Sequence, residues 1–251
     1  MKNLTEKITN FLEKNKGTKK VPCFDLGLIN YDAAYNIQLK IFELVKLGYA
    51  SGVILLLEHT PVITIGNNKN RNNLLVSEES LKSQGIELVQ SNRGGDITFH
   101  GPGQLICYPI FNIMHFGKDL TIFIWNLEQI IINTLEEYKI KGTRINKLRG
   151  VFVDNSKIAS IGLHVKKWVT LHGFSFNVHI NLDYFKNIIA CGLKDHSQTS
   201  MQKILSQNIP ISDVKELICK KFAKIFKIKT LNPDILSPSN KHKIKLLAQN
   251  N

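Results

Sequence analysis

The sequence has no closely spaced pair of cysteines and no long hydrophobic run. Its most apolar short stretch, Val53 to Leu57, is far below the ~20 residues that a membrane-spanning helix needs. The opening segment, Met1 to Lys20, has no signal-peptide core and no arginine, which argues against secretory and organellar targeting. We therefore expect a cytoplasmic protein without a membrane partner.

Four cysteines stand far apart, and none belongs to a C-x-x-C pair: Cys23, Cys107, Cys191 and Cys219. Neither a disulfide framework nor a cysteine zinc site is indicated by such spacing, and no metal site is expected. Each cysteine is therefore treated as a free thiol.

Acidic residues are also few, because 20 Asp and Glu face 33 Lys and Arg, for a formal net charge of +13. This charge favours acidic partners, which include nucleic acid, an anionic membrane surface and acidic proteins. The lysines are scattered along the chain, however, and there is no aromatic-rich ribonucleoprotein motif or clustered basic helix. We expect no nucleic acid partner, and a nucleic-acid-binding module remains the rival from another functional class.

Hydrophobic residues make up 43% of the 251 residues, enough to bury a sizeable core. Residues 1–20 predict a polar, partly helical extension, residues 21–230 a single domain, and residues 231–251 a polar tail. Apolar spacing predicts helices over 31–47 and 119–140, with Asp119 or Thr121 as the cap of the second, and a third helix capped by Ser212. Strands are predicted over 52–59, 62–65, 151–153, 158–165 and 169–178. The expected fold is α+β, with a mixed, largely antiparallel sheet and packed helices.

The most unusual stretch is RGGDITFHGPGQ, residues 93–104. Its glycines allow a backbone to approach a ligand closely, while Arg93 could hold a phosphate or carboxylate and His100 could donate or shuttle a proton. The alternative is a glycine-rich hairpin with a structural histidine. The stretch matches neither common nucleotide-binding glycine motif.

A second cluster comprises KIASIG, residues 157–162, and HGFSFN, residues 172–177, where small residues interrupt apolar strands. Such positions often mark the close approach of a ligand or another backbone, although packing against a helix is the competing explanation. Near matches to two serine-nucleophile motifs, GFSFN and SMQK, lack the companion residues and are attributed to chance.

The third cluster is ACGL, residues 190–193. A lone cysteine is more often a small buried hydrophobic residue, which is the interpretation for Cys107 and Cys219. Cys191 differs because it is followed by glycine, in a segment where the next backbone N–H could help to bind an oxyanion. It is the candidate nucleophile.

These clusters, together with LLEHTPVITIG at residues 56–66, resemble the lipoyl(octanoyl) transferase family over roughly residues 50 to 200. The resemblance implies that Cys191 carries an acyl thioester and that Lys157 promotes its ionisation. It also implies an acyl site formed by Arg93, Gly94, Gly95, Asp96, Ile97, Thr98, Phe99, His100, Ser160, Ile161, Gly162, Gly173, Phe174 and Ser175.

The same resemblance implies a biotin/lipoate ligase-like catalytic domain that uses no cofactor. Its expected donor is octanoyl-acyl carrier protein, and its expected acceptors are lipoyl domains of 2-oxoacid dehydrogenases and the glycine cleavage H protein. Asp96 is a departure, because the family commonly has an uncharged glutamine there, and a carboxylate near the site could alter local electrostatics.

The implied chemistry has two steps. Thiolate attack on the octanoyl thioester exchanges one thioester for another and needs no ATP. The amine of the acceptor lysine then attacks, after losing a proton to neutral Lys157, His100 or His172, among which the sequence does not choose. The nearest rival, an ATP-dependent lipoate or biotin ligase of the same fold, would need a nucleotide site and would not need Cys191.

Overall fold

The computed structural model describes residues 2–18, 20–68, 71–193 and 195–231. Apart from Leu231, the predicted polar tail lies outside these residues. Seven strands form one large sheet in the order β10-β1-β2-β6-β9-β8-β7. Their bounds are Lys20–Ile29 for β1, Gly52–His59 for β2, Gln104–Phe111 for β6, Val151–Val153 for β7, Ser156–Lys166 for β8, Val169–Asn177 for β9 and Lys229–Leu231 for β10.

Most neighbours in the large sheet are antiparallel, and only β1 pairs in parallel, with β10 and with β2. A second, three-stranded sheet has the order β4-β3-β5, with β3 at Val62–Ile65, β4 at Glu87–Gln90 and β5 at Thr98–His100. The predicted mixed, largely antiparallel sheet is confirmed, and so is the β7-β8-β9 meander.

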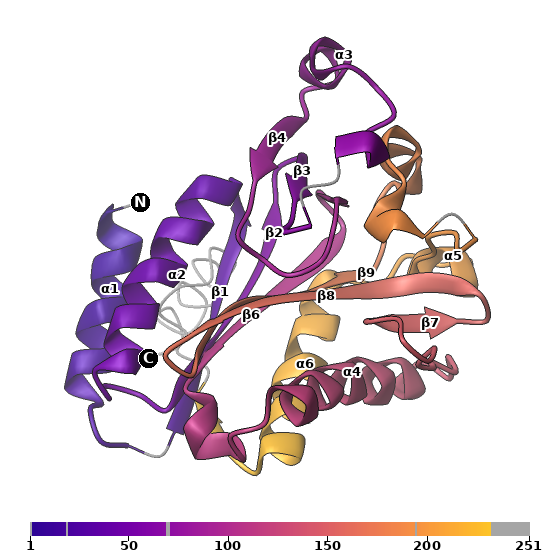
Figure 1. The fold of residues 1–251 in the computed structure, drawn as a ribbon. Coiled ribbons are helices and arrows are strands. Elements are labelled where there is room, and N and C mark those ends of the chain that lie inside the picture. The colour runs from indigo at the N-terminus through magenta and orange to yellow at the C-terminus, as the bar shows by residue number, and fades with distance from the viewer. Residues whose placement is uncertain (1, 19, 69–70, 194, 232–251) are drawn as a thin grey trace, which may run out of the picture.

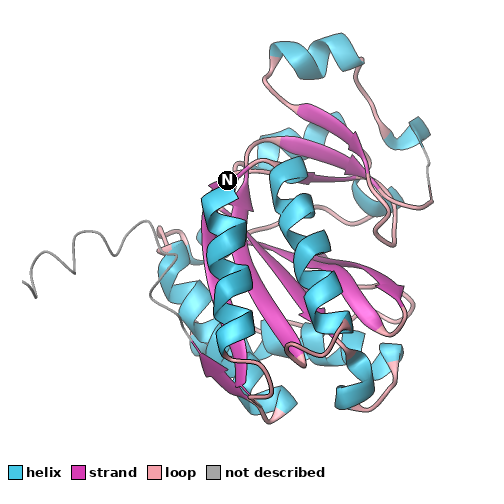
Figure 2. Cartoon of the chain, turned by 90° about the vertical axis from the view of Figure 1, so that its left-hand side faces the viewer, coloured by secondary structure: helices cyan, strands magenta, loops and turns pink. Residues whose placement is uncertain are grey.

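Helices cover both faces of the large sheet (Figures 1 and 2). They are α1 at Lys2–Lys14, α2 at Tyr31–Lys46, α3 at Glu78–Ser83, α4 at Leu120–Glu137, α5 at Met201–Leu205 and α6 at Ile211–Phe226. The α1 and α2 helices pack on one face, and α4 and α6 on the other. Four short 3₁₀ helices complete the described elements: η1 at Arg71–Asn73, η2 at Ile113–Phe116, η3 at Leu182–Asn187 and η4 at Ala190–Gly192.

The unbroken apolar run of β2 follows from the position of the sheet between two layers of helices. Side chains alternate along a strand, so Ile54 and Leu56 join the core under α4 and α6. Val53, Leu55 and Leu57 join the core under α2 instead. Both faces of the strand are therefore buried, which removes the polar positions that a half-exposed strand would show.

The amino-terminal segment contributes to the core. Ile8 and Leu12 of α1 are buried against α2 and β1, and the ring of Phe11 meets that of Phe24 edge to face. No helix in the described part of the chain combines the length and the apolarity that crossing a bilayer would require.

The predicted helix cap is confirmed for α4 and wrong for α6. Asp119 caps α4 by accepting a hydrogen bond from the backbone N–H of Ile122 at 3.0 Å. The prediction of Ser212 as the cap of α6 is wrong, because the helix already begins at Ile211 after Pro210. A proline fits this position since it fixes a helix-compatible φ and needs no hydrogen-bond partner for its nitrogen.

Two of the four cysteines are not free. Cys23 of β1 and Cys219 of α6 form a disulfide that ties the helix to the sheet, which corrects the expectation of four free thiols. Their sequence separation of 196 residues gave no local signal of the pairing. Cys107, which is buried, and Cys191, which is half-buried, are the free cysteines of the described chain.

Candidate active site

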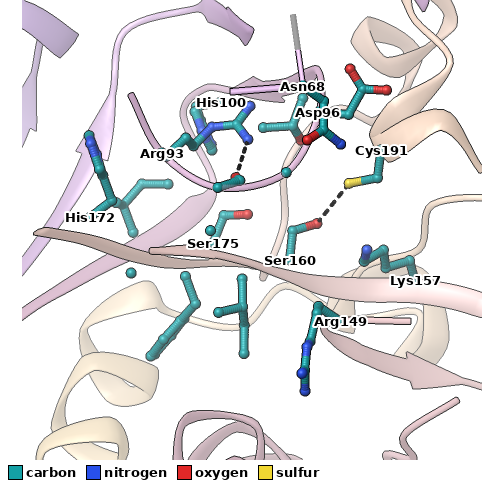
Figure 3. Close-up of a pocket in the computed structure, with 18 of the residues that line it drawn as sticks. Asn68, Arg93, Asp96, His100, Arg149, Lys157, Ser160, His172, Ser175 and Cys191 are labelled. Carbon is teal, nitrogen blue, oxygen red and sulfur yellow. Dashed lines mark hydrogen bonds between the residues drawn. The ribbon is translucent and has the colours of Figure 1, made fainter. Parts of the chain in front are cut away.

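A cavity of about 210 Å³ lies where β8 and β9 meet the loop before β5 and the short η4 turn (Figure 3). All the predicted site residues except Ile97 and Phe99 line it. They are Arg93, Gly94, Gly95, Asp96, Thr98, His100, Lys157, Ser160, Ile161, Gly162, Gly173, Phe174, Ser175 and Cys191. Segments that are almost a hundred positions apart in the sequence thus converge on one hollow.

Ile97 and Phe99 do not line the cavity but lie in the core of the small sheet, where both side chains are fully buried. They alternate with Asp96, Thr98 and His100, which line the cavity, as the two faces of an extended chain must. The carbonyl of Ile97 nevertheless supports the site, because it accepts the backbone N–H of Cys191 at 2.8 Å.

Arg93 holds its own loop against the small sheet. Its guanidinium donates to the hydroxyl and the carbonyl of Thr64, at 2.7–3.0 Å, and to the carbonyl of Gly94 at 3.1 Å. These bonds engage most of the guanidinium donors, and the role of Arg93 in holding a phosphate or carboxylate stays a prediction. Burial lowers the pKa of Arg93, while the nearby Cys191 side chain acts in the opposite direction, as a potential anion beside a cation does.

Cys191 lies in a strained turn. Its φ of 57° and ψ of 18° fall in the left-handed region, which a residue with a side chain adopts at a cost of about 1–2 kcal/mol. The sulfur is 3.9 Å from the hydroxyl oxygen of Ser160, toward which it points in Figure 3. Strain of this kind concentrates at functional sites, where the surrounding structure holds the conformation in place.

The predicted oxyanion donor after Cys191 is not available. The N–H of Gly192 already donates to the carbonyl of Ile189 at 3.0 Å, inside the η4 turn. The hydroxyl of Ser160, which lines the cavity beside the sulfur, is a polar group that sequence reasoning had placed in the acyl site without a specific role.

A β-bulge brings Lys157 and Ser160 to the same cavity. Residues three apart on a regular strand point to opposite faces, so these two side chains would diverge. The pairing of β8 with β7 shifts register, however, because Val151 pairs with Ala159 whereas Phe152 pairs with Lys157. The extra residue changes the alternation, and both side chains line the cavity.

The Lys157 side chain is almost fully buried and forms no ion pair with the described residues. Its ammonium lies 5.4 Å from the centre of the Phe152 ring, close enough for a cation–π contact. Gly150 makes room for it, since a Cβ there would lie 2.8 Å from Lys157 Cε and 2.3 Å from the carbonyl oxygen of Ala159. A buried lysine without a carboxylate partner among the described residues thus lines the same cavity as the free thiol of Cys191.

Both histidines of the cavity are uncharged at neutral pH. Burial, followed by the charges of His59 and Arg93, holds the pKa of His100 well below its usual value. Burial likewise lowers the pKa of His172 to about 3, and its Nε2 contacts the amide oxygen of Asn92 at 2.6 Å. Such low pKa values make both rings weak bases at neutral pH.

Buried histidines also predict acid sensitivity. Burial lowers the pKa of His59 to about 4 and that of His172 to about 3, from 6.5 in the unfolded chain. The unfolded state therefore binds more protons below pH 6.5, and the free energy of unfolding falls as pH drops from 6.5 toward 3. Urea titrations should show a loss on the order of 2 kcal/mol per histidine between pH 7.5 and pH 5. In a His59→Gln variant the free energy of unfolding should depend less steeply on pH. A wild-type free energy of unfolding that is equal at pH 7.5 and pH 5 would refute the low pKa values of these histidines.

Gly173 is required by close packing of β9 on β6. A Cβ at this position would lie 2.1 Å from the carbonyl oxygen of Cys107 and 2.5 Å from Pro109 Cδ. We expect Gly173→Ala to destabilise the fold by about 1–3 kcal/mol, the usual cost of overpacking. Urea unfolding measures the free energy of unfolding of the variant and the wild type. A loss well below about 1 kcal/mol would contradict the packing argument.

Several lining residues were not predicted: Tyr31, Asn68, Ile106, Tyr108, Lys147, Leu148, Arg149 and Leu193. The tyrosines come from a helix and a strand whose patterns are ordinary, so nothing in the sequence marks them. Lys147 and Arg149 belong to a stretch rich in basic residues, which could have indicated them. Among the described residues, no group of three or more His, Cys, Asp or Glu side chains gathers in a way that could hold a metal ion.

The fold and this cavity define a catalytic domain of the lipoyl protein ligase type. Residues 30–223 match the lipoyl protein ligase A/B catalytic domain, and the chain belongs to that family. Octanoyltransferase from Thermoanaerobacter sp. (strain X514) is 46% identical over 211 residues, which cover 84% of this chain and 92% of that protein. Within the family, the chain is therefore an acyltransferase of the octanoyltransferase group.

Solved structures share the fold. Lipoate-protein ligase A bound with ATP has a TM-score of 0.67 at 14% identity, over 92% of this chain and 95% of that one. Biotin protein ligase from Aquifex aeolicus in complex with biotin and ATP has a TM-score of 0.52 at 12% identity, over 82% and 70%. The predicted biotin/lipoate ligase-like fold is confirmed.

Proposed function

We propose that the protein transfers an octanoyl group from octanoyl-acyl carrier protein, through a thioester on Cys191, to a lysine of lipoyl-accepting domains. The observation that carries the proposal is the convergence of a free cysteine in a strained turn with a buried, unpaired lysine in one cavity. The identity of the acyl group is proposed from the relatives, whose printed name, octanoyltransferase, specifies octanoyl transfer.

The first step is acylation of Cys191. In this proposal the ammonium of Lys157, which lines the same cavity as Cys191, supplies the positive charge that a thiolate nucleophile needs. The thiolate attacks the carbonyl of the donor thioester, a new C–S bond forms on Cys191, and the C–S bond to the carrier breaks. The carrier leaves as its own thiolate, which takes up the proton of the Lys157 ammonium. The hydroxyl of Ser160, 3.9 Å from the sulfur, can donate a hydrogen bond to the thiolate before attack.

The second step is transfer to the acceptor. The incoming lysine must be neutral to attack. The proposed base is Lys157, which lines the cavity and has given up its proton during the first step. A C–N bond forms, the C–S bond to Cys191 breaks, and the cysteine leaves as a thiolate. Lys157 takes the first proton of the acceptor ammonium, and the second proton lost by that nitrogen passes to solvent. The amide product is more stable than the thioester, so transfer is downhill without ATP.

The acyl chain needs an apolar wall. Ile106, Ile161, Phe174 and Leu193 line the cavity together with the glycines of β8 and β9. Gly162 and Gly173 pair across β8 and β9 and also line the cavity, but the space that a side chain would take at each is occupied by the carbonyl oxygens of Gly94 and Cys107.

Expected partners are octanoyl-acyl carrier protein as donor, and lipoyl domains of 2-oxoacid dehydrogenases and the glycine cleavage H protein as acceptors. The experiment is transfer without nucleotide: the enzyme, octanoyl-carrier protein and an unmodified lipoyl domain are mixed, and the domain is weighed by mass spectrometry. The proposal expects octanoylated domain. Modification that appears only when ATP and free octanoate are supplied would assign the chain to the ligases instead.

A further inference from the structure

One surface segment stands out by charge. Residues 139–149, KIKGTRINKLR, contain five basic residues and no acidic ones, and are called the basic segment below. The segment follows the carboxy-terminal end of α4, at the end of the large sheet opposite the β8–β9 turn (Figure 1). Its basic side chains differ in whether they form an ion pair, and this difference indicates what the segment can do.

Only one cation of the basic segment is neutralised within the described chain. Arg144 pairs with the buried carboxylate of Glu128 at 2.9 Å and also bonds the side chain of Gln129. The same carboxylate accepts the backbone N–H of Gly150 at 3.0 Å. Glu128 therefore holds both ends of the loop at residues 144–150. The charge of Arg144 is neutralised by this ion pair.

The other four cations are exposed and form no ion pair with the described residues: Lys139, Lys141, Lys147 and Arg149. Lys147 and Arg149 border the active-site cavity, whereas Lys139 and Lys141 border a separate surface hollow with Ile204 and Asp154. The positive charge therefore runs from the mouth of the cavity outward over the surface. Ile204 adds an exposed apolar side chain to the outer part.

We propose that the basic segment is the docking surface for the acidic carrier protein that delivers the octanoyl group. Complementary charge guides the encounter of two proteins, and exposed cations at the rim act mainly on the association rate. The outward extent of the segment favours the donor over the acceptor. A carrier protein holds its acyl group on a long flexible arm, so its body rests away from Cys191, whereas a short lysine side chain requires its domain to lie directly over the mouth.

This inference rests on the proposed function, and its test separates the two. The variant is Lys139→Gln with Lys141→Gln, because neither residue lines the active-site cavity. The matched control is Lys166→Gln with Lys167→Gln, which removes the same charge from exposed residues at the β8–β9 turn. Each protein is acylated by octanoyl-carrier protein and, separately, by octanoyl-N-acetylcysteamine, a small uncharged thioester.

At low ionic strength the variant should raise KM for the carrier by about tenfold, with an unchanged rate toward the small thioester. The control should change neither, and added salt should narrow the difference between variant and wild type. An unchanged KM, an equal loss with the small thioester, an equal loss in the control, or a loss confined to transfer onto the lipoyl domain would each overturn the inference. Failure of the wild type to form a thioester with either donor would refute the proposed function itself.

Discussion

Cys191→Ser should abolish the octanoyl-enzyme intermediate and reduce transfer by at least about 10³-fold. A serine hydroxyl is a far weaker nucleophile than a thiolate, and neither histidine of the cavity is basic enough to activate it. Intact-mass spectrometry after mixing with octanoyl-carrier protein measures the intermediate, and octanoylation of a lipoyl domain measures the transfer. The substitution changes one atom in a half-buried side chain, so the fold should remain intact.

Cys107→Ala is the matched control, because Cys107 is the other free cysteine of the described chain. Burial raises the pKa of Cys107 well above its usual value, which keeps the thiol protonated and unreactive. Its replacement should leave the acyl adduct on the enzyme. An acyl adduct that survives Cys191→Ser and disappears with Cys107→Ala would show that Cys107 carries the thioester and would contradict the proposal.

Lys157→Met should slow acylation by about 10²-fold or more while preserving the fold. Methionine keeps the length and the apolar packing of the side chain against Phe152 and Gly150 but removes the charge. The substitution thereby removes the proposed source of positive charge for the thiolate nucleophile. Thioester formation, followed by rapid mixing and mass spectrometry, measures the rate, and iodoacetamide alkylation across pH measures the ionised fraction directly.

The control is Lys166→Met, at the exposed end of the same strand. It should change neither the acylation rate nor the alkylation profile. An alkylation profile of Lys157→Met that coincides with the wild type would remove the proposed role in activating the thiol. Slower acylation with such a profile would instead point to a role in binding the donor.

The sequence predicted the elements whose signal is local. Strict spacing of apolar residues indicated α2 and α4, and the buried run of β2 and the β7-β8-β9 meander were equally clear. The strand β1 was not predicted, because its pattern includes Pro22 and Asp25 and its partners, β2 and β10, are distant in the sequence. The Cys23–Cys219 disulfide was missed for the same reason.

For the site, motifs indicated which segments converge, and the structure supplied the geometry. The bulge in β8 that brings Lys157 beside Ser160 depends on the register with β7, which no motif encodes. The bonds that engage Arg93 depend on Thr64 of β3, 29 positions earlier in the chain, and the η4 turn is held by the bond from the Cys191 N–H to the carbonyl of Ile97. The low pKa values of the cavity histidines likewise follow from burial by distant segments.

The most direct test is a pulse and chase on the wild-type protein. The enzyme is acylated with octanoyl-carrier protein, separated from the donor, and mapped by peptide mass spectrometry before an unmodified lipoyl domain is added without ATP. The account predicts octanoyl on Cys191 alone, followed by its loss from the enzyme at the rate at which it appears on the lysine of the domain. An adduct that stays on Cys191 while the domain is modified only in the presence of fresh donor would contradict it.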